Sequence, residues 1–280
     1  MSATHVPEEE LAAPSPYVLR VDRAAHVPET DVRKALADGD MGFLHSYTTG
    51  SAVDGPGVRV VVWTSGCMWR CRYCHNPDTW KIGNGIPVSV ARATDELSKY
   101  KEGLKVMNGG LTLSGGEPLM QHRFAAKLLA AVKKMGVHTA IETNGYFGKH
   151  LTDVELGSVD LVLLGIKSWG EARHKDLTGM DLAPTLAFAE RLAGLRKPVW
   201  IRFVLVPGLT DDPEIAAGIA AFAAGLGNVK RVEVLPFHQL GRFKWKELGL
   251  NYSLEDTAAP PPELIRTTVD IFRKQGLTAY

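Results

Sequence analysis

Cysteine is scarce in this sequence: 280 residues contain three, Cys67, Cys71 and Cys74, and all of them lie in one short segment. An odd number of tightly clustered cysteines does not suit a disulfide framework and is typical of a reducing, intracellular setting. The sequence also lacks any run of about 18 apolar residues, which argues against a transmembrane helix. Residues 1–20 lack the basic start and apolar core of a signal peptide. We therefore expect a cytoplasmic protein with no membrane partner.

An excess of charge of either sign is also missing, because 32 Lys and Arg residues are balanced by 31 Asp and Glu residues. The net charge of +1 gives no general attraction for nucleic acid or an anionic membrane, so neither is expected as a partner. The 45% hydrophobic and 22% charged residues are ordinary for a soluble globular protein. No internal repeat, paired carboxylates or nucleophile–base set stands out.

The composition changes near residue 42. Residues 1–41 are rich in Ala, Pro and charge, which predicts a poorly ordered N-terminal arm with a short helix at 29–38. In residues 42–280, apolar β-branched runs alternate with amphipathic stretches. The predicted strands are 58–64, 110–114, 138–143, 160–166, 199–206 and 229–237. The predicted helices are 89–104, 121–135, 183–194, 212–224 and 262–275, with a less distinct one after 143–147. This alternation indicates βα units and a parallel sheet.

Six βα units are too few for a closed eight-stranded barrel. The fold class expected for the core domain, residues 42–280, is therefore α/β, as a partial (β/α)6 TIM-like barrel. The chemically suggestive residues each follow a predicted strand: Cys67, "SGGE" (114–117), "ETNG" (142–145), Lys167, "PG" (207–208) and His238. Because the carboxyl ends of parallel strands meet at one edge, these residues are expected to share one site.

The cysteine spacing C-x3-C-x2-C has three interpretations. A structural zinc ion could use the three thiolates and His75, but Cys74 and His75 are adjacent and project apart, and such sites usually draw on two separated ligand pairs. Coincidentally clustered free thiols are a second interpretation. An iron–sulfur cluster fits best, because thiolates on one loop are its usual ligands. Three thiolates leave one iron of a four-iron cluster open to a substrate or cofactor, as in an open zinc position.

The cysteine segment, with Tyr73 before the last cysteine, resembles the signature of radical S-adenosylmethionine (SAM) enzymes. Further motifs resemble one family of glycyl-radical enzyme activases, the pyruvate formate-lyase-activating enzymes. These motifs are "YTTGSAVDGPGVRVVVWTSGCMWRCRYCHNPDTW" (47–80), "GGLTLSGGEPLMQ" (109–121), "IETNGY" (141–146), "WIRFVLVPGLTDD" (200–212) and "VEVLPFHQLGRFKWKELGLNY" (232–252). The resemblance covers roughly residues 42–280. Several long motifs in one order are more specific than the cysteine spacing alone.

The resemblance implies a barrel of the radical SAM type and a 4Fe-4S cluster held by the three cysteines, with the amino and carboxylate groups of SAM on the fourth iron. The positions that it implies in SAM binding are Tyr73, Cys74, His75, Gly115, Gly116, Glu117, Glu142, Asn144, Gly165, Ile166, Lys167 and His238. Tyr73 and His75 are expected near the adenine. Lys167 suits a carboxylate or a ribose oxygen.

Each of these motifs also has a structural interpretation. Paired glycines after a strand are common in turns, although they also let backbone approach a ligand. A single lysine is usually solvated, and a single histidine is often structural. Asp54 lies in "DGPG", which reads as a turn, and Arg202 lies inside an apolar strand, where a charge needs a partner. The resemblance implies instead that Asp54 meets the backbone of the protein substrate and that Arg202 helps to hold the substrate loop. Both join the cysteines in the expected catalytic set.

Two positions depart from the family pattern. Members commonly have aspartate where this chain has Glu142 and Gly165, and those aspartates help to form a monovalent cation site beside SAM. Glu142 keeps one carboxylate on a longer arm, whereas Gly165 supplies none. The cation site implied by the resemblance therefore lacks one carboxylate.

The resemblance implies an oxidoreductase of anaerobic metabolism, in which one electron from the reduced cluster cleaves SAM to methionine and a 5′-deoxyadenosyl radical. That radical takes hydrogen from a glycine Cα of pyruvate formate-lyase. Activases of other glycyl-radical enzymes often carry a ferredoxin-like insert, for which three cysteines are too few. The alternatives are a radical SAM enzyme acting on another glycyl-radical enzyme, a small molecule or RNA, and a non-enzymatic zinc-stabilised module. The expected partners are pyruvate formate-lyase or a related glycyl-radical enzyme and a flavodoxin or ferredoxin electron donor, and the chain is expected to be a monomer.

Overall fold

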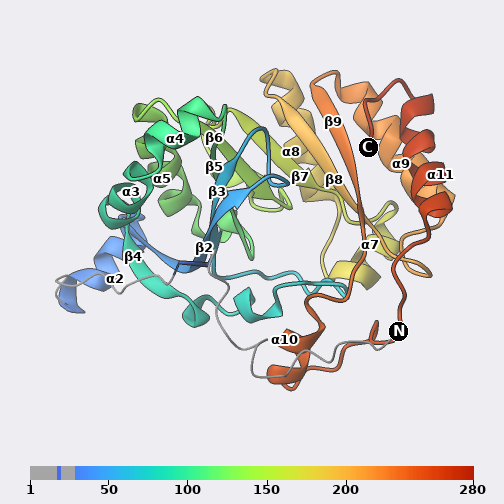
Figure 1. Ribbon diagram of the computed structural model, residues 1–280, viewed down its shortest axis with the longest axis horizontal. Coiled ribbons are helices and arrows are strands. Elements are labelled where there is room, and N and C mark those ends of the chain that lie inside the picture. The colour runs from blue at the N-terminus through green and yellow to red at the C-terminus, as the bar shows by residue number, and fades with distance from the viewer. Residues whose placement is uncertain (1–17, 20–28) are drawn as a thin grey trace, which may run out of the picture.

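A computed structural model describes residues 18–19 and 29–280, which form one nine-stranded sheet with helices along its outer side (Figure 1). In sheet order the strands are β1 (Val18–Leu19), β2 (Met41–Ser51), β3 (Arg59–Thr64), β5 (Gly110–Gly115), β6 (His138–Thr143), β7 (Leu161–Gly165), β8 (Val199–Leu205) and β9 (Val229–Pro236). The short strand β4 (Ile86–Ser89) pairs with β2.

Six neighbouring strands, β3 and β5 to β9, are parallel and agree with the six predicted strands to within two residues at each end. The sheet ends at β9, whose outer edge is covered by the last residues of the chain. There Val232 N–H donates to Thr278 O at 2.8 Å, and Val234 N–H donates to Tyr280 O at 3.0 Å. The described sheet is therefore open, as expected for a partial barrel.

The helices are α2 (Glu29–Asp38), α3 (Val90–Ser98), α4 (Lys101–Val106), α5 (His122–Lys134), α6 (Asp153–Leu156), α7 (Glu171–Thr178), α8 (Ala183–Gly194), α9 (Pro213–Leu226), α10 (Arg242–Glu247) and α11 (Pro262–Lys274). Short 3-10 turns cover Pro77–Thr79, Ile82–Asn84, Pro118–Gln121 and Gly148–His150. The predicted helix at 89–104 is two helices, because Lys99 and Tyr100 N–H donate to carbonyls three residues back and end α3.

The predicted helix at 29–38 is confirmed as α2. Residues 1–17 and 20–28 lie outside the described residues, so the boundary between arm and core stays a prediction. Within the described ranges, no helix is long and apolar enough to cross a membrane.

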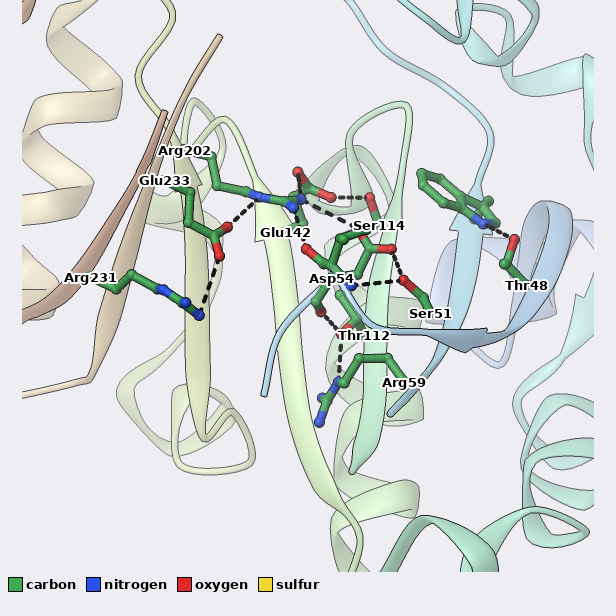
Figure 2. A network of polar contacts seen from close by, with 12 residues as sticks. Thr48, Ser51, Asp54, Arg59, Thr112, Ser114, Glu142, Arg202, Arg231 and Glu233 are labelled. Atoms are coloured by element: carbon green, nitrogen blue, oxygen red, sulfur yellow. Dashed lines mark hydrogen bonds and ion pairs between the residues drawn. The ribbon is translucent and has the colours of Figure 1, made fainter. Parts of the chain in front are cut away.

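The two faces of the parallel sheet differ in polarity. Side chains that point toward the helices form the main apolar core, as Ile201 and Phe203 do in β8. Arg202, between them in β8, and Glu142 in β6 belong to the opposite, inward face, which carries a polar network (Figure 2). Because side chains alternate along a strand, an apolar strand can project a charge inward without disturbing the outer core. This inward face and the carboxyl edge of the sheet position the candidate site.

Candidate active site

The three cysteines lie on the segment that leaves β3, and this segment is fixed on two sides. Arg70 N–H and Arg72 N–H donate to the carbonyls of Thr178 and Leu177 at the end of α7, at 2.8 Å and 3.1 Å. On the other side, Trp245 Nε1 of α10 donates to the Cys74 carbonyl at 2.8 Å. In Figure 1, α10 lies apart from the helices that cover the sheet, beside the segment that follows β3. The loop is therefore held by its own backbone contacts, independently of the thiols.

The three thiols are free and half-buried. Burial raises the pKa of Cys71 to about 12 and also raises the pKa values of Cys67 and Cys74, while the positive charge of Lys167 opposes the shifts of Cys71 and Cys74. Thiols of this kind lose their protons when a metal binds. Among residues 18–19 and 29–280, no group of three or more His, Cys, Asp or Glu side chains is placed to hold a single metal ion.

His75 is directed away from the zinc arrangement considered for it. Its ring stacks on the ring of His238, with centroids 4.1 Å apart and 29° between the planes. His75 Nε2 also lies 3.2 Å from the His238 carbonyl oxygen. Burial and the neighbouring His238 lower the pKa of His75 to about 4, so the ring is neutral near pH 7. The structure brings these two predicted residues together and leaves the single-zinc interpretation without its fourth ligand.

Tyr73 lies in a small apolar cluster with Phe237, Trp245 and Tyr252, and it is 5% exposed. Its hydroxyl has no hydrogen-bond partner within the described residues. The side chain therefore packs the cysteine loop against α10, and its contact with adenine stays a prediction.

Gly115 and Gly116 bring the end of β5 against the end of β3 and the cysteine loop. A Cβ atom on Gly115 would lie 2.2 Å from the backbone of Thr64, and Gly115 has a φ of +128°, which disfavours other residues. A Cβ atom on Gly116 would lie 2.5 Å from the Gly66 carbonyl oxygen and 3.1 Å from Cys67 Cβ. The paired glycines are thus required by close approach of protein backbone, and their role toward a ligand stays a prediction.

Glu117 joins the "SGGE" and "ETNG" segments. Its carboxylate accepts hydrogen bonds from Leu119 N–H, Thr143 Oγ1 and Asn144 N–H at 2.8, 2.7 and 2.8 Å, and it is 1% exposed. Burial raises the pKa of Glu117 to about 7, although these hydrogen bonds favour the ionised form. Asn144 Oδ1 accepts from Tyr146 N–H at 2.9 Å. Both side chains shape the edge of the site, so Glu117 is a positioning residue.

Arg202 is the centre of the inward-facing network and is paired with three carboxylates (Figure 2). Its Nη1 lies 2.6 Å from Glu142 Oε1 and 3.3 Å from Asp54 Oδ1, and its Nε lies 3.0 Å from Glu233 Oε2. Nη2 donates to the Val53 carbonyl at 2.5 Å. Burial alone would lower the pKa of Arg202, but the three carboxylates raise it above its ordinary value. Arg202 therefore ties the turn after β2 to strands β6, β8 and β9.

The other oxygen atoms of Asp54 and Glu142 in this network also accept hydrogen bonds. Ser51 Oγ donates to Asp54 Oδ2 at 2.5 Å, and Thr112 Oγ1 donates to the Asp54 carbonyl at 2.5 Å. Ser114 Oγ donates to Glu142 Oε2 at 2.7 Å. Burial alone would raise the pKa of Glu142, but Arg202 and this hydrogen bond bring it below its ordinary value. Arg202 thus forms the ion pairs that its structural interpretation predicts, and Asp54 is one of its partners.

At the end of β7, the two neighbouring residues Ile166 and Lys167 differ in burial and in what they contact. Ile166 is fully buried in the helix-facing core, so its side chain cannot reach a ligand. Lys167 is half-buried and has neither a hydrogen bond nor an ion pair with any described residue. A Cβ atom on Gly165 would lie 3.0 Å from Lys167 Nζ. The ammonium group therefore lies over Gly165, within reach of the site.

Sequence reasoning missed Glu233 and Trp245. Glu233 had a detectable signal, because it is a charge inside an apolar strand, as Arg202 is, and the two residues are register partners in β8 and β9. Trp245 lies in a motif that we had quoted, but its bond to Cys74 spans 171 residues and has no local signature.

Known proteins similar to this chain agree with this geometry. A family model described as a 4Fe-4S single cluster domain matches residues 53–167. A pyruvate formate-lyase-activating enzyme from Listeria monocytogenes is 44% identical over 231 residues, covering 80% of this chain and 93% of that protein. One from Staphylococcus aureus is 43% identical over 233 residues, covering 80% and 92%. This chain belongs to the pyruvate formate-lyase-activating enzyme family.

Membership of this family confirms the expected reaction class, that of radical SAM enzymes, and the expected cofactors, a 4Fe-4S cluster and SAM. A solved radical SAM methyltransferase from Sphaerobacter thermophilus has the same fold, with a TM-score of 0.57 at 15% identity over 91% of this chain and 81% of that one. The partial barrel is thereby confirmed as the fold class. The roles of individual residues stay predictions.

Proposed function

We propose that this chain activates pyruvate formate-lyase by generating a radical on a glycine of that enzyme. The observation that carries the proposal is the loop after β3, which presents three free thiols at the carboxyl edge of six parallel strands. A 4Fe-4S cluster held by Cys67, Cys71 and Cys74 would supply the electron for reductive cleavage of SAM, and the 5′-deoxyadenosyl fragment would receive the hydrogen atom of the glycine Cα.

The protein's part in this reaction is to hold and orient. Cys67, Cys71 and Cys74 would ligate three irons, which leaves the fourth to the amino and carboxylate groups of SAM. The ammonium of Lys167 has no protein partner among the described residues, so it is available to the SAM carboxylate. The stacked pair of His75 and His238 would flank the nucleoside. No acid–base residue is required, because the catalytic demand is to place one carbon against one C–H bond and to exclude water.

Asp54 and Arg202 act in this proposal as positioning residues for the substrate loop. Their ion pair fixes the turn at 53–54 against β8, on the inward face of an open barrel. A six-unit barrel leaves a lateral gap through which a loop of the partner can enter, whereas a closed barrel is filled with side chains. Ordering that loop costs roughly 1–2 kcal/mol per residue, so binding should be weak until the partner releases it.

We further propose a flavodoxin or ferredoxin as the electron donor and a monomeric, cytoplasmic activase. A chain with only three cysteines has none to spare for additional clusters that could relay electrons internally. An external one-electron donor therefore has to reach the cysteine loop directly.

Anaerobic reconstitution tests the proposal. We expect about four irons and a matching amount of sulfide per chain, no zinc, and reductive formation of 5′-deoxyadenosine from SAM. Cys71→Ala should abolish cluster loading and SAM cleavage. Ser65→Ala is the matched control in the same loop, because the Ser65 hydroxyl is buried without a hydrogen-bond partner among the described residues. Zinc without iron, or SAM cleavage by Cys71→Ala at the parent rate, would contradict the proposal.

A further inference from the structure

The monovalent cation site implied by the family resemblance does not fit this chain. Gly165 contributes no side-chain oxygen ligand, and the carboxylate of Glu142 is already paired with the guanidinium of Arg202. One of its oxygens lies 2.6 Å from Arg202 Nη1, and the other accepts from Ser114 Oγ at 2.7 Å. A potassium or sodium ion would therefore have to displace the buried guanidinium of Arg202 from the Glu142 carboxylate, and β7 would offer it no second carboxylate.

A fixed positive charge stands next to the missing carboxylate. Lys167 Nζ and Cε lie 3.0 Å and 3.1 Å from the place where a Cβ atom of Gly165 would be. A larger residue at 165 would push the lysine away, so glycine is what lets the ammonium lie there. Lys167 is half-buried, and its positive charge opposes the effect of burial on the pKa values of Glu117 and Glu142.

We propose that the Lys167 ammonium, admitted by Gly165, replaces the monovalent cation beside SAM, so that this chain binds SAM without potassium or sodium. The inference rests on the proposed function, since it concerns the carboxylate of SAM. Arg202 belongs to the same arrangement: Gly165 and Arg202 are register partners in β7 and β8, and Arg202 neutralises the carboxylate that remains.

The test is the affinity of the cluster-loaded chain for SAM across a series of potassium chloride concentrations, with choline chloride holding the ionic strength constant. We expect the dissociation constant of the parent to change by less than about twofold, because no site links potassium to SAM. The sodium-23 resonance of added sodium chloride should show no broadening that depends on SAM. Neither measurement requires turnover.

Two variants convert the site. Gly165→Asp with Lys167→Met restores the carboxylate and removes the ammonium, and SAM affinity should then rise at least about fivefold with potassium. Gly165→Ala with Lys167→Met is the matched control, which makes the same steric change and supplies no carboxylate. It should bind SAM more weakly than the parent and should not respond to potassium. Gly165 does not have a positive φ, and the atoms nearest to its Cβ position are the flexible end of the side chain at 167, which can move aside. Iron and sulfide contents establish that each variant keeps its cluster.

A parent whose SAM affinity rises fivefold or more with potassium would overturn the inference, as would a Gly165→Asp, Lys167→Met variant that is as indifferent to potassium as its alanine control. Neither of these two results would contradict the proposed function, because both concern only the dependence of SAM affinity on potassium. If instead the parent loads iron but binds and cleaves no SAM in any salt, the proposed function itself has failed.

Discussion

Replacing Arg202 by methionine should destabilise the protein strongly, because one guanidinium serves three buried carboxylates. The side chain of Arg202 is 7% exposed, and those of Asp54, Glu142 and Glu233 are 12%, 25% and 14% exposed. Methionine retains much of the apolar length of arginine, so the main change is the loss of the charge and its hydrogen bonds. The carboxylates would be left with Ser51, Ser114 and Arg231 as their remaining partners.

The expected loss is about 3–5 kcal/mol in the free energy of unfolding, which is the usual cost of removing one partner from a buried ion pair. With a urea dependence of about 2–3 kcal/mol per molar, the unfolding midpoint should fall by about 1–2 M. Arg202→Lys keeps the charge and loses the fork that spans three carboxylates, so its loss should be smaller. The assay is urea unfolding of the reduced, full-length chain under anaerobic conditions, followed by circular dichroism.

The loss should also depend on pH. In the parent, the pKa of Glu142 lies below its ordinary value, so its contribution to stability is present above that value and is lost as the pH falls through the folded pKa. In Arg202→Met, the buried Glu142 resists ionisation, and the cost grows as the pH rises. The difference between parent and variant should therefore be larger near pH about 7.5 than near pH about 4. A loss below about 1 kcal/mol, or an equal loss at both pH values, would refute this account of the network.

Further predictions concern the residues that shape the edge of the site. Gly116→Ala should lower the iron content after reconstitution, because the added Cβ would lie 3.1 Å from Cys67 Cβ and 2.5 Å from the Gly66 carbonyl oxygen. An iron content equal to that of the parent would contradict this packing. Glu117→Gln should destabilise the chain by about 1–3 kcal/mol in urea unfolding, since an amide replaces one of the oxygens that accept from backbone and hydroxyl groups. Because burial raises the pKa of Glu117 to about 7, its contribution to stability should decline as the pH rises from its ordinary value of 4.5 through 7, and Glu117→Gln should remove that slope.

The parallel part of the fold could be predicted because strands such as β5, β7 and β8 are buried on both faces. Near-continuous apolar runs such as 199–206 are visible without any partner, and their alternation with helices indicates the topology. The antiparallel strand β2 was missed for a physical reason. Its pairing with β3 shifts register between Leu44 and Ser46 and again between Thr49 and Ser51, so the two-residue period of its side chains is interrupted.

Two helices were missed because their sequences carry weak patterns. α7 is polar around most of its circumference, and it is held through its buried residues His174, Leu177 and Thr178. α10 has six residues, too few to show a helical period, and it is stabilised by Trp245 against the cysteine loop. Tertiary contacts decide both elements.

The predicted residues do lie where the parallel strands end, but the partners of their side chains were not predictable. Arg202 contacts Asp54, Glu142 and Glu233 across 148, 60 and 31 residues, and no local pattern records such pairs. The family resemblance implies that the motif around Glu117 lies beside SAM, yet the Glu117 carboxylate accepts hydrogen bonds from the protein's own donors. A motif thus locates a candidate site, while the structure shows which of its side chains already have protein partners.

The proposed activation requires hydrogen transfer from a glycine of pyruvate formate-lyase to a fragment of SAM. The most direct test uses pyruvate formate-lyase labelled with deuterium at glycine Cα, mixed anaerobically with the reduced, cluster-loaded chain and SAM. We expect a glycyl radical in the electron paramagnetic resonance spectrum and deuterium in the 5′-deoxyadenosine detected by mass spectrometry. Formation of 5′-deoxyadenosine without deuterium, and with no glycyl radical, would contradict the proposed activation.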